Sequence, residues 1–325
     1  MKTTATTEIM GGLGNQLFQI FNLLAYSFRH NSYFYFSTEP ISCGQRKITY
    51  WKTPFLEALN NFVKQLNSTQ NHQQHITYHE HNFHYEAIPQ APPSSQLIKF
   101  FGYFQSYKYF QDQQDIIYKF IRLRETQAAI REKTKDPQYG YDYENTVAVH
   151  FRVGDYKNLP NHHPLMTLEY YTAALTRLGE IPASSESHNI LYFCEEADQA
   201  YVQQEMIIPL QQNPLFKNKF TFQCIDHKLA DWEQLIIMSL CRHHIIANST
   251  FSWWGAYLGG SAPSPPHLGQ ADASAVSENH NQSLPDTGAG GQSPQVYYPK
   301  TWFGPAIGHK NISDLFPLHW QRINI

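Results

Sequence analysis

An arginine, a histidine and a carboxylate stand close together in the segment HFRVGDY, residues 150–156. The stretch TVAVHFRV predicts a strand, and its period of two puts His150 and Arg152 on the face opposite the valines. A guanidinium offers permanently charged donors in a fork that suits phosphate oxygens. We therefore expect Arg152, His150 and Asp155 to form a catalytic or anion-binding centre. The alternative is a structural ion pair between Arg152 and Asp155.

A run of hydroxyl residues precedes a predicted helix in ANSTFSWWGAYL, which begins at Ala247. Hydroxyls and N–H groups at a helix start suit a phosphate. The candidate binding residues in this run are Asn248, Ser249, Thr250, Phe251 and Ser252. Taken singly, Ser249 and Ser252 also fit ordinary N-cap residues. Beside Arg152 at one sheet edge, the run favours an anion site.

Carboxylates mark the ends of two further predicted strands, at Glu195-Glu196 and Asp226-His227. The carboxyl ends of parallel strands meet at one edge, so these acids join the arginine in a set that fits a nucleoside diphosphate. The nearest approach to a DxD motif, Asp142-Tyr143-Glu144, lies in a polar linker. We expect no metal, with arginine and helix termini balancing the phosphate charge. The sequence also lacks a Walker A motif, a GxSxG elbow and a zinc-type Cys/His spacing, which disfavours phosphoryl transfer and serine hydrolysis.

A glycine-rich turn near the N-terminus, Gly11-Gly12-Leu13-Gly14-Asn15-Gln16, precedes apolar residues at helical spacing. Such a turn lets a ligand approach backbone N–H groups. It is also typical of a tight turn before a helix. The residues alone leave both interpretations open.

Strands and helices that must position these residues alternate through the second half of the chain. TVAVHFRV, NILYFCEE, FTFQCID and HHIIAN predict strands, LEYYTAALTRL, QAYVQQEMIIPL and WEQLIIMSLCR predict helices, and SWWGAYL opens another helix. This order predicts an α/β fold with a parallel, doubly wound sheet. In the first half, YFYFS predicts a strand, IKFFGYFQSYKYF a strand passing into a helix start, and QDIIYKFIRL a helix.

Polar stretches divide the chain. Residues 60–93 are rich in Gln, Asn and His, and we expect a solvated region there, because no acid or cysteine set completes a metal site around the histidines. A polar connection near Tyr141 predicts domains at 1–143 and 144–325. Residues 259–295 have the Gly, Pro, Ala and Ser content of a flexible insertion, either a solvated linker or a cover over the site.

Composition excludes several classes of protein. With 42% hydrophobic and 15% aromatic residues, the 325-residue chain can bury a core, and its net charge of −3 argues against a nucleic-acid-binding protein. The scattered Cys43, Cys194, Cys224 and Cys241 predict small buried side chains rather than disulfides. Without a signal-peptide pattern or a run of eighteen apolar residues, we expect a cytoplasmic protein that spans no membrane, although peripheral membrane association stays compatible.

Five blocks in this order resemble those of the bacterial α-1,2-fucosyltransferases of glycosyltransferase family 11. GGLGNQLFQ resembles the opening motif of that family, FFGYFQSYKYF its GYFQ segment, and HFRVGDY its H-x-R-x-G-D-Y signature. ANSTFSWWGAYL is similar to the NS[ST][FY]SWW block, and YYPKTWFG to the closing P-K-x-W element.

The resemblance implies a metal-independent, GT-B-like enzyme with two facing Rossmann-like domains, the N-terminal one mainly for the acceptor and the C-terminal one for GDP-fucose. It implies inverting transfer of L-fucose from GDP-β-L-fucose to the 2-hydroxyl of a terminal β-galactoside, such as lactose or a lipopolysaccharide side chain. Arg152 would neutralise the departing β-phosphate, with His150 beside it. The implied donor-binding residues are Gly12, Leu13, Gly14, Asn15, Gln16, Arg152, Glu195, Asn248, Ser249, Thr250, Phe251 and Ser252. Asn15 would reach toward the fucose and phosphate.

Two questions stay open after this resemblance. The galactose proton needs an acceptor, for which Asp155, Glu195 and Glu196 are candidates, unless the step needs none. The chain carries Gln234 where the family usually has an acid. The candidates for reading guanine are then Asp231, Glu233 and Gln234. This departure favours the alternative of a non-catalytic GDP-sugar or glycan-binding protein of the same fold, whereas the joint presence of the blocks favours an enzyme.

Overall fold

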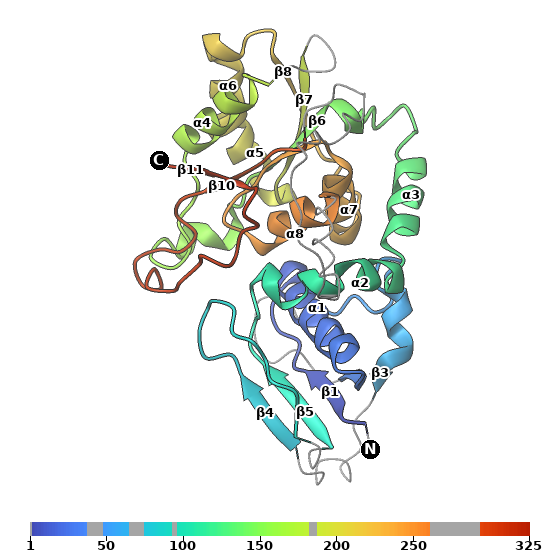
Figure 1. The fold of residues 1–325 in the computed structure, drawn as a ribbon. Coiled ribbons are helices and arrows are strands. Elements are labelled where there is room, and N and C mark those ends of the chain that lie inside the picture. Colours follow the sequence, from blue (N-terminus) through green and yellow to red (C-terminus); the bar gives the residue numbers. More distant parts are fainter. Residues whose placement is uncertain (1, 38–47, 65–74, 93–95, 182–186, 261–292) are drawn as a thin grey trace, which may run out of the picture.

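Two separate parallel sheets organise the chain in the computed structural model (Figure 1). The structure describes residues 2–37, 48–64, 75–92, 96–181, 187–260 and 293–325. Strands up to Phe101 form the first sheet, strands from Thr146 onward form the second, and every described pair of strands runs parallel. The predicted α/β fold with two parallel sheets is therefore confirmed.

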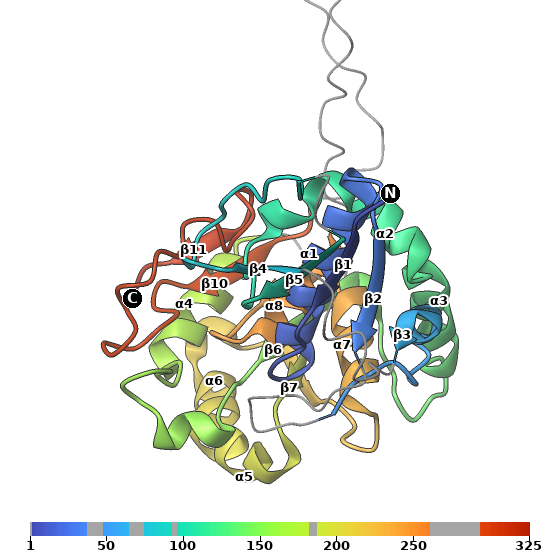
Figure 2. The same cartoon turned by 90° about the horizontal axis from the view of Figure 1, so that it is seen from below.

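The first sheet has the strand order β3-β2-β1-β5-β4. Its strands are β1 (Thr4–Thr7), β2 (Tyr33–Ser37), β3 (Val63–Lys64), β4 (His75–His79) and β5 (Leu97–Phe101). The helix α1 (Leu13–Arg29) connects β1 to β2 and buries apolar side chains on more than one face, including Phe18 and Phe21. Because a helix that is apolar on several sides belongs inside a protein, α1 packs between the first sheet and the helix α8 (Thr250–Gly259) (Figures 1 and 2).

The second sheet has the strand order β11-β10-β9-β6-β7-β8. Its strands are β6 (Thr146–His150), β7 (His188–Phe193), β8 (Phe220–Cys224), β9 (His243–Ile245), β10 (Val296–Pro299) and β11 (Gln321–Ile323). Successive side chains of β6 point to opposite faces of the sheet and pack in two hydrophobic cores. Val147 and Val149 lie in one core, and Ala148 lies in the other. Both faces of this strand are thus buried, as its continuous apolar sequence predicts.

Helices α4 (Leu168–Leu178) and α7 (Asp231–Leu240) lie where the sequence predicts them, as does α8. The helix predicted from residue 199 is interrupted instead. A π-helical turn over Gln203–Ile207 separates α5 (Gln199–Val202) from α6 (Ile208–Gln212). Pro209 has no N–H to complete the ordinary bond to the residue four positions earlier, which accounts for the wider turn.

The two halves share one hydrophobic core where α1 meets α8. The ring of Phe18 lies 4.5 Å from that of Trp253, and the ring of Phe21 lies 4.5 Å from that of Trp254. Phe110 stacks on Trp254 at 5.3 Å. All five side chains are fully buried. Aromatic contacts of this kind stabilise beyond the area they bury, so the junction is packed like a protein interior.

The C-terminal segment returns to the first half and is fastened there by Asp314. Its carboxylate pairs with Lys108 and accepts a hydrogen bond from the Tyr85 N–H at 3.3 Å. The Ser106 hydroxyl donates to the Asp314 carbonyl at 2.7 Å. The Asp314 side chain is only 17% exposed, so this attachment is partly shielded from water.

The expectation of a solvated region over residues 60–93 is wrong in part. β3 ends there, and β4 pairs with β5 over five positions, from His75 beside Leu97 to His79 beside Phe101. β4 lies at the edge of the sheet, where a strand needs little apolar pattern, so its polar sequence concealed it. The short strand β11, which forms one edge of the second sheet, is likewise not predicted from the sequence.

The predicted helix QDIIYKFIRL ends early. The observed helix, α2, spans only Gln114–Phe120. Arg122 then turns the chain with a left-handed φ of 53°, and a further helix, α3 (Leu123–Lys133), follows. α3 precedes residue 143 but packs on α7, where Gln127 donates to the Ser239 hydroxyl at 3.0 Å. Residues 261–292, most of the expected insertion, lie outside the described residues, as does Cys43.

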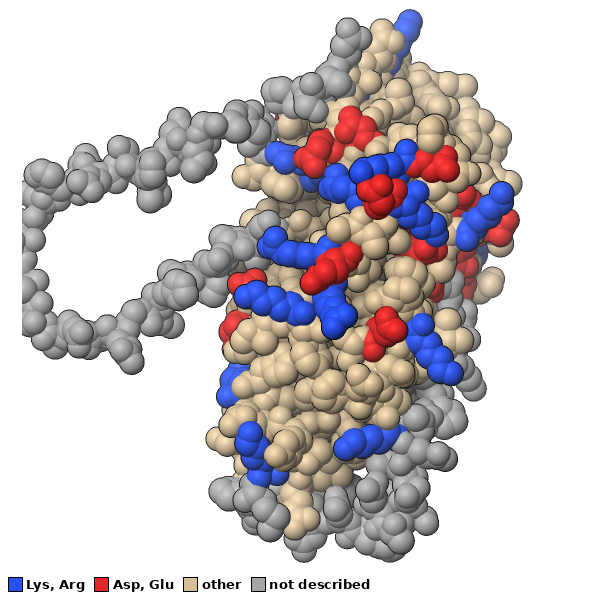
Figure 3. All heavy atoms as spheres, turned by 90° about the vertical axis from the view of Figure 1, so that its right-hand side faces the viewer, with Lys and Arg blue, Asp and Glu red and all other residues tan. Residues whose placement is uncertain are grey.

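Charges of both signs alternate on the side of the molecule that carries α3 (Figure 3). The pairs on and around α3 are Arg131–Glu144, Lys133–Glu233 and Lys135–Glu132. This face therefore presents no field of a single sign. Among the helices that the structure describes, none has the length and apolar character to cross a bilayer.

Candidate active site

Arg152 lies two residues after β6 and contacts two carboxylates. Its Nη1 donates to Glu195 Oε1 at 2.5 Å, and its Nη2 pairs with Asp155. The guanidinium also lies over the ring of Tyr156, 4.9 Å from the centroid. Its side chain is 22% exposed, so it is held on three sides yet reaches solvent. The structure thus brings together three residues that the sequence predicts for one site.

The neighbours of Arg152 fix its charge. Burial opposes the charged guanidinium, but Asp155, Tyr156 and Glu195 outweigh burial and hold the pKa of Arg152 above its ordinary value. Burial also raises the pKa of Tyr156 to about 12, so this phenol stays neutral. An anion that binds Arg152 must therefore share a permanent cation with two acids.

Asp198 shapes the loop that carries Asp155, although no motif pointed to it. One Asp198 oxygen accepts from the Gly154 N–H at 2.6 Å, and the other pairs with Lys157 at 3.1 Å. Gly154 has a φ of 33°, a left-handed value that favours glycine. The buried Asp198 therefore holds the turn that lets Asp155 return to Arg152.

His150 is buried at the end of β6. Burial, and next the charge of Arg152, lower the pKa of His150 to about 3, so its imidazole is neutral near pH 7. Its Nδ1 has no hydrogen-bond partner among the residues that the structure describes, and its ring lies 5.6 Å from that of Phe251. His150 therefore faces the start of α8, with an Nδ1 that is buried and without a partner in the described residues.

Tyr156 links Arg152 to the segment before α8. Its ring lies against the guanidinium, and its hydroxyl donates to the Asn248 carbonyl at 3.2 Å. Ser249 caps α8, since its hydroxyl accepts from the Phe251 N–H at 3.3 Å. The predicted guanidinium and the predicted helix start thus lie within one chain of contacts. The sequence singles out Tyr156 only as part of the HFRVGDY block.

Two predicted binding side chains point into the interior. The Asn248 amide, in a residue 2% exposed, donates to the carbonyls of Pro164 and Trp302 at 3.0 and 3.2 Å. Ser252 is 0% exposed, and its hydroxyl donates to the Ser249 carbonyl at 3.2 Å. We correct these expectations: both side chains hold the loops around α8, because a buried donor is satisfied by nearby carbonyls before any ligand reaches it.

The glycine turn has a different use for each of its glycines. Gly11 has a φ of 76°, which favours glycine, and a side chain on Gly12 would meet nothing within 4 Å. A Cβ on Gly14 would lie 2.5 Å from the Thr250 carbonyl carbon and 2.6 Å from the Phe251 nitrogen. Gly14 therefore permits close packing of α1 on α8, and open space for a ligand lies at Gly12.

The other residues of this turn also have different structural roles. Leu13 is buried in the core. The buried Gln16 donates to the carbonyls of Gly11 and Ile48 at 2.9 and 2.8 Å, so its amide braces the turn rather than meeting a ligand. Asn15 crosses between the halves.

Asn15 Oδ1 accepts from the Thr250 hydroxyl at 2.9 Å and from the Gln105 amide at 3.0 Å. Gln105 belongs to the GYFQ segment, and no chemical role is expected for it from the sequence. One amide oxygen thus joins three segments that are far apart in the chain. Asn15 thus reaches the start of α8, and its predicted approach to the fucose and phosphate stays a prediction.

The three guanine candidates already have partners within the chain. Asp231 accepts a hydrogen bond from the Tyr50 hydroxyl, which belongs to the first half. Glu233 caps α7 by accepting from the Ala230 N–H at 2.9 Å and pairs with Lys133. Gln234 donates to the Leu229 carbonyl at 2.9 Å. The geometry therefore gives no support to guanine recognition by these groups as they stand.

Comparison with known proteins gives one match over most of the chain. The profile of Glycosyl transferase family 11 matches residues 2–263. An α-1,2-colitosyltransferase of Escherichia coli is 28% identical over 166 residues, which cover 50% of this chain and 51% of that protein. The O-antigen biosynthesis glycosyltransferase WbnK of Escherichia coli is 27% identical over 119 residues, 35% of this chain and 34% of that protein. The chain thus matches about half or less of the length of these relatives.

Among the solved structures that match, two fucosyltransferases do so at low similarity. An Arabidopsis thaliana FUT1 mutant in complex with GDP has a TM-score of 0.45 and 10% identity, over 80% of this chain and 69% of that one. The fucosyltransferase NodZ from Bradyrhizobium has a TM-score of 0.46 and 11% identity, over 79% of this chain and 93% of that one.

Proposed function

The chain belongs to glycosyl transferase family 11, and on that premise we propose that it is an inverting α-1,2-fucosyltransferase. The proposed reaction moves L-fucose from GDP-β-L-fucose to the 2-hydroxyl of a terminal β-galactoside, such as lactose or a lipopolysaccharide side chain. The observation that carries this proposal is the chain of contacts from Arg152 through Tyr156 to the start of α8. It pairs a permanent cation with a helix N-terminus, as a departing nucleotide diphosphate requires.

The relatives support a glycosyl donor. Which sugar this donor carries must be determined by experiment. The name of one relative states an α-1,2 linkage, which supports the proposed linkage here. The same name states colitose, so GDP-colitose is the competing donor. In our proposal the second sheet carries the donor site and the first sheet side mainly the acceptor site. Protein groups, with no metal at the phosphates, balance the charge of GDP.

Charge moves onto the β-phosphate as the bond between fucose and GDP breaks. Groups that stabilise that charge more in the transition state than in the ground state accelerate the reaction. We assign this work to Arg152 and to the main-chain N–H groups at the start of α8, because these donors are positioned before the reaction. Removing one such donor costs about 3 kcal/mol, or a hundredfold to a thousandfold in rate.

His150 acts in this scheme as a neutral group. With a pKa of about 3 it adds no charge near pH 7, and because its Nδ1 is buried we assign it to positioning the start of α8 through the contact with Phe251. Asp155, Glu195 and Glu196 remain the candidates to accept the galactose proton, and the first two already lie at Arg152. A phosphate that takes over part of the guanidinium would release one of these carboxylates for that task.

The test compares two arginine variants by the release of GDP from GDP-fucose with lactose as acceptor. We expect Arg152→Ala to lower kcat at least a hundredfold and Arg152→Lys to restore only part of it, because a lysine keeps the charge but not the fork. Arg177→Ala is the matched control, since Arg177 is exposed on α4. Near-ultraviolet circular dichroism checks that each variant is folded.

Three outcomes decide the proposal. A loss confined to the Arg152 variants supports it. Near-normal turnover in a folded Arg152→Ala variant would remove Arg152 from the mechanism. If the unaltered protein releases no GDP above background with either GDP-fucose or GDP-colitose, the alternative of a non-catalytic GDP-sugar or glycan-binding protein stands instead.

A further inference from the structure

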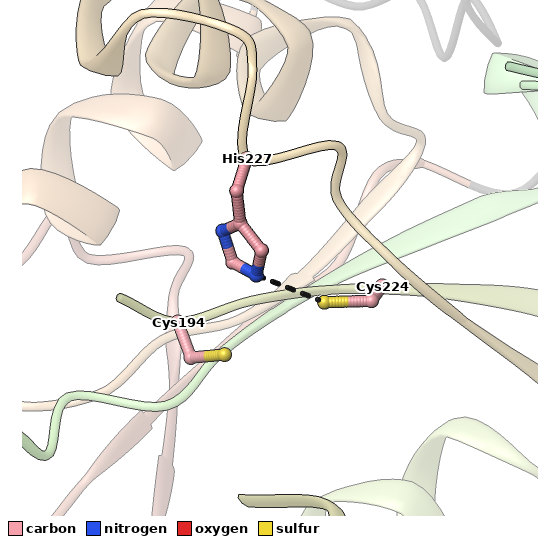
Figure 4. Close-up of side chains that lie close together, drawn as sticks. All are labelled: Cys194, Cys224 and His227. Carbon is pink, nitrogen blue, oxygen red and sulfur yellow. Dashed lines mark hydrogen bonds between the residues drawn. The ribbon is translucent and has the colours of Figure 1, made fainter. Parts of the chain in front are cut away.

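Two thiols and an imidazole converge just beyond the second sheet (Figure 4). The ligand atoms of Cys194, Cys224 and His227 all lie within 4.8 Å of one another. Figure 4 shows both sulfurs and the imidazole turned toward the same space. None of these groups takes part in the proposed transfer, so that reaction does not explain why they lie together.

Neighbouring strands hold the two cysteines. Cys194 follows β7 directly, and Cys224 ends β8, where its Cα lies beside that of Tyr192. The ladder extends one bond further, because the Ile225 N–H donates to the Tyr192 carbonyl at 2.9 Å. Both thiols therefore project from hydrogen-bonded parts of the sheet, where their separation is fixed.

The imidazole comes from the turn after β8. Asp226 fixes this turn, since its carboxylate accepts from the Lys228 N–H at 2.9 Å. His227 Nε2 lies 3.6 Å from Cys224 Sγ. In a tetrahedral zinc site, bonds of about 2.3 Å to sulfur and 2.0 Å to nitrogen place those two atoms about 3.5 Å apart. The pair is thus already spaced as zinc ligands, with little movement needed.

Simpler interpretations explain only part of the cluster. Hydrogen bonds between Cys194 and Cys224 and between Cys224 and His227 account for the contacts pair by pair, but they place no atom in the space that all three groups face. A disulfide would account for the two cysteines but not for the imidazole. Both cysteines are free thiols, Cys194 is buried, and the other two residues are half-buried, so an ion could enter from one side.

We propose that Cys194, Cys224 and His227 bind one thiophilic divalent ion of the Zn²⁺ type. Thiolate and imidazole ligands suit this ion, and two thiolates balance its charge when both thiols release their protons. Within the described parts of the chain, no fourth His, Cys, Asp or Glu belongs to the cluster, so a solvent molecule completes the tetrahedron.

The site lies next to the proposed donor site but is independent of it. Cys194 precedes Glu195, whose carboxylate contacts Arg152. A bound ion would fix the main chain beside that ion pair without touching the phosphates. Zinc binding can therefore be measured, and can fail, whatever reaction the protein catalyses.

The experiment uses the full chain, reduced with a phosphine, stripped with a chelator and dialysed. Zn²⁺ is then titrated against a chromophoric competitor. We expect one Zn²⁺ per chain, and at least a tenfold loss of affinity in Cys224→Ser and His227→Gln. Cys241→Ser is the matched control, because that buried thiol only donates to the Ile237 carbonyl at the end of α7. Zn²⁺ should raise the Tm of the unaltered protein and of this control alone.

Cobalt adds a spectroscopic reading of the ligands. Co²⁺ in place of Zn²⁺ should give a thiolate-to-metal charge-transfer band in the unaltered protein and in Cys241→Ser, and a weakened band in Cys224→Ser. Equal zinc affinity in Cys224→Ser and Cys241→Ser would overturn the proposal, since the ion would then lie elsewhere. The proposal would also be overturned if the reduced protein bound no zinc. This holds equally if Cys194 and Cys224 are found joined in a disulfide before the reduction step.

Discussion

Gly14 lies on α1 where that helix packs against the start of α8. The substitution Gly14→Ala therefore measures how rigidly the two halves are joined. A Cβ at this position would lie 2.5 to 2.7 Å from three backbone atoms of Thr250 and Phe251, whereas ordinary contact begins at 3.4 Å. One helix must therefore move by about 0.9 Å relative to the other. No side-chain rotation can relieve the contact, because the atoms belong to the main chain beside a buried aromatic core.

The expected magnitude follows from two opposing effects. Overpacking a filled interior costs about 1–3 kcal/mol. Alanine recovers up to about 1 kcal/mol through its better helix propensity. We therefore expect Gly14→Ala to lower the free energy of unfolding by about 1–2 kcal/mol. Gly12→Ala is the matched control, since a Cβ there meets nothing within 4 Å. Its stability should stay within about 0.5 kcal/mol of the original.

Equilibrium unfolding in urea gives the free energies, with fluorescence of the nearby Trp253 and Trp254 as the probe. Titration calorimetry with GDP then reports on the start of α8, where a displaced helix should bind more weakly. If Gly14→Ala matches Gly12→Ala in stability and keeps the original affinity for GDP, the close approach is not a constraint and the reasoning fails.

Three further predictions test other parts of the structure. Stability should fall as the pH decreases from 6.5 to 4, because burial lowers the pKa values of His150, His243 and His244 to about 3, 3 and 4, and the unfolded chain takes up protons that the folded chain refuses. Each histidine adds up to about 1.4 kcal/mol per pH unit, so His244→Gln should flatten the curve of unfolding free energy against pH, and an unchanged slope contradicts the assignment. Asn248→Ala should cost about 2–4 kcal/mol in urea unfolding, because two interior carbonyls lose their donor, against about 1 kcal/mol for Ser249→Ala; equal costs would argue against an interior role. Asp314→Asn should cost about 1 kcal/mol at low salt and less at high salt, and a cost independent of salt would point to hydrogen bonding alone.

The sequence predicts best those elements whose pattern is both long and regular. LEYYTAALTRL has an amphipathic period and becomes α4 residue for residue, and β6 and β7 follow from continuous apolar runs. β4 and α3 are not predicted because both have polar sequences. β4 is an edge strand with a polar sequence, and α3 is a polar helix that gains its stability from packing on α7.

For the candidate site, residue types are predictable and side-chain directions are not. Arg152, Asp155 and Glu195 meet because strand ends share an edge, which topology alone implies. Ser252 and Gly14 look like ligand-binding residues in their motifs, but the phase of α8 turns Ser252 inward and α8 itself occupies the space at Gly14. The contact at Gly14 joins segments more than 200 residues apart, which no local pattern records.

Thr250 decides which groups at the start of α8 can serve a phosphate. Its hydroxyl has one proton and donates it to Asn15 Oδ1 at 2.9 Å, so in this arrangement it offers a phosphate only lone pairs. The Ser249 hydroxyl accepts from the Phe251 N–H and keeps its own proton, whereas Ser252 donates inward. The donors left at the start of α8 are therefore the Ser249 hydroxyl and those main-chain N–H groups that a helix leaves without intrahelical partners. Recognition of the nucleotide would then rest on the backbone of α8, on the Ser249 hydroxyl and on Arg152, while Asn15 holds that backbone against the glycine turn. Of the three hydroxyl groups in this run, those of Thr250 and Ser252 would thus act through geometry, by holding the N–H groups in place.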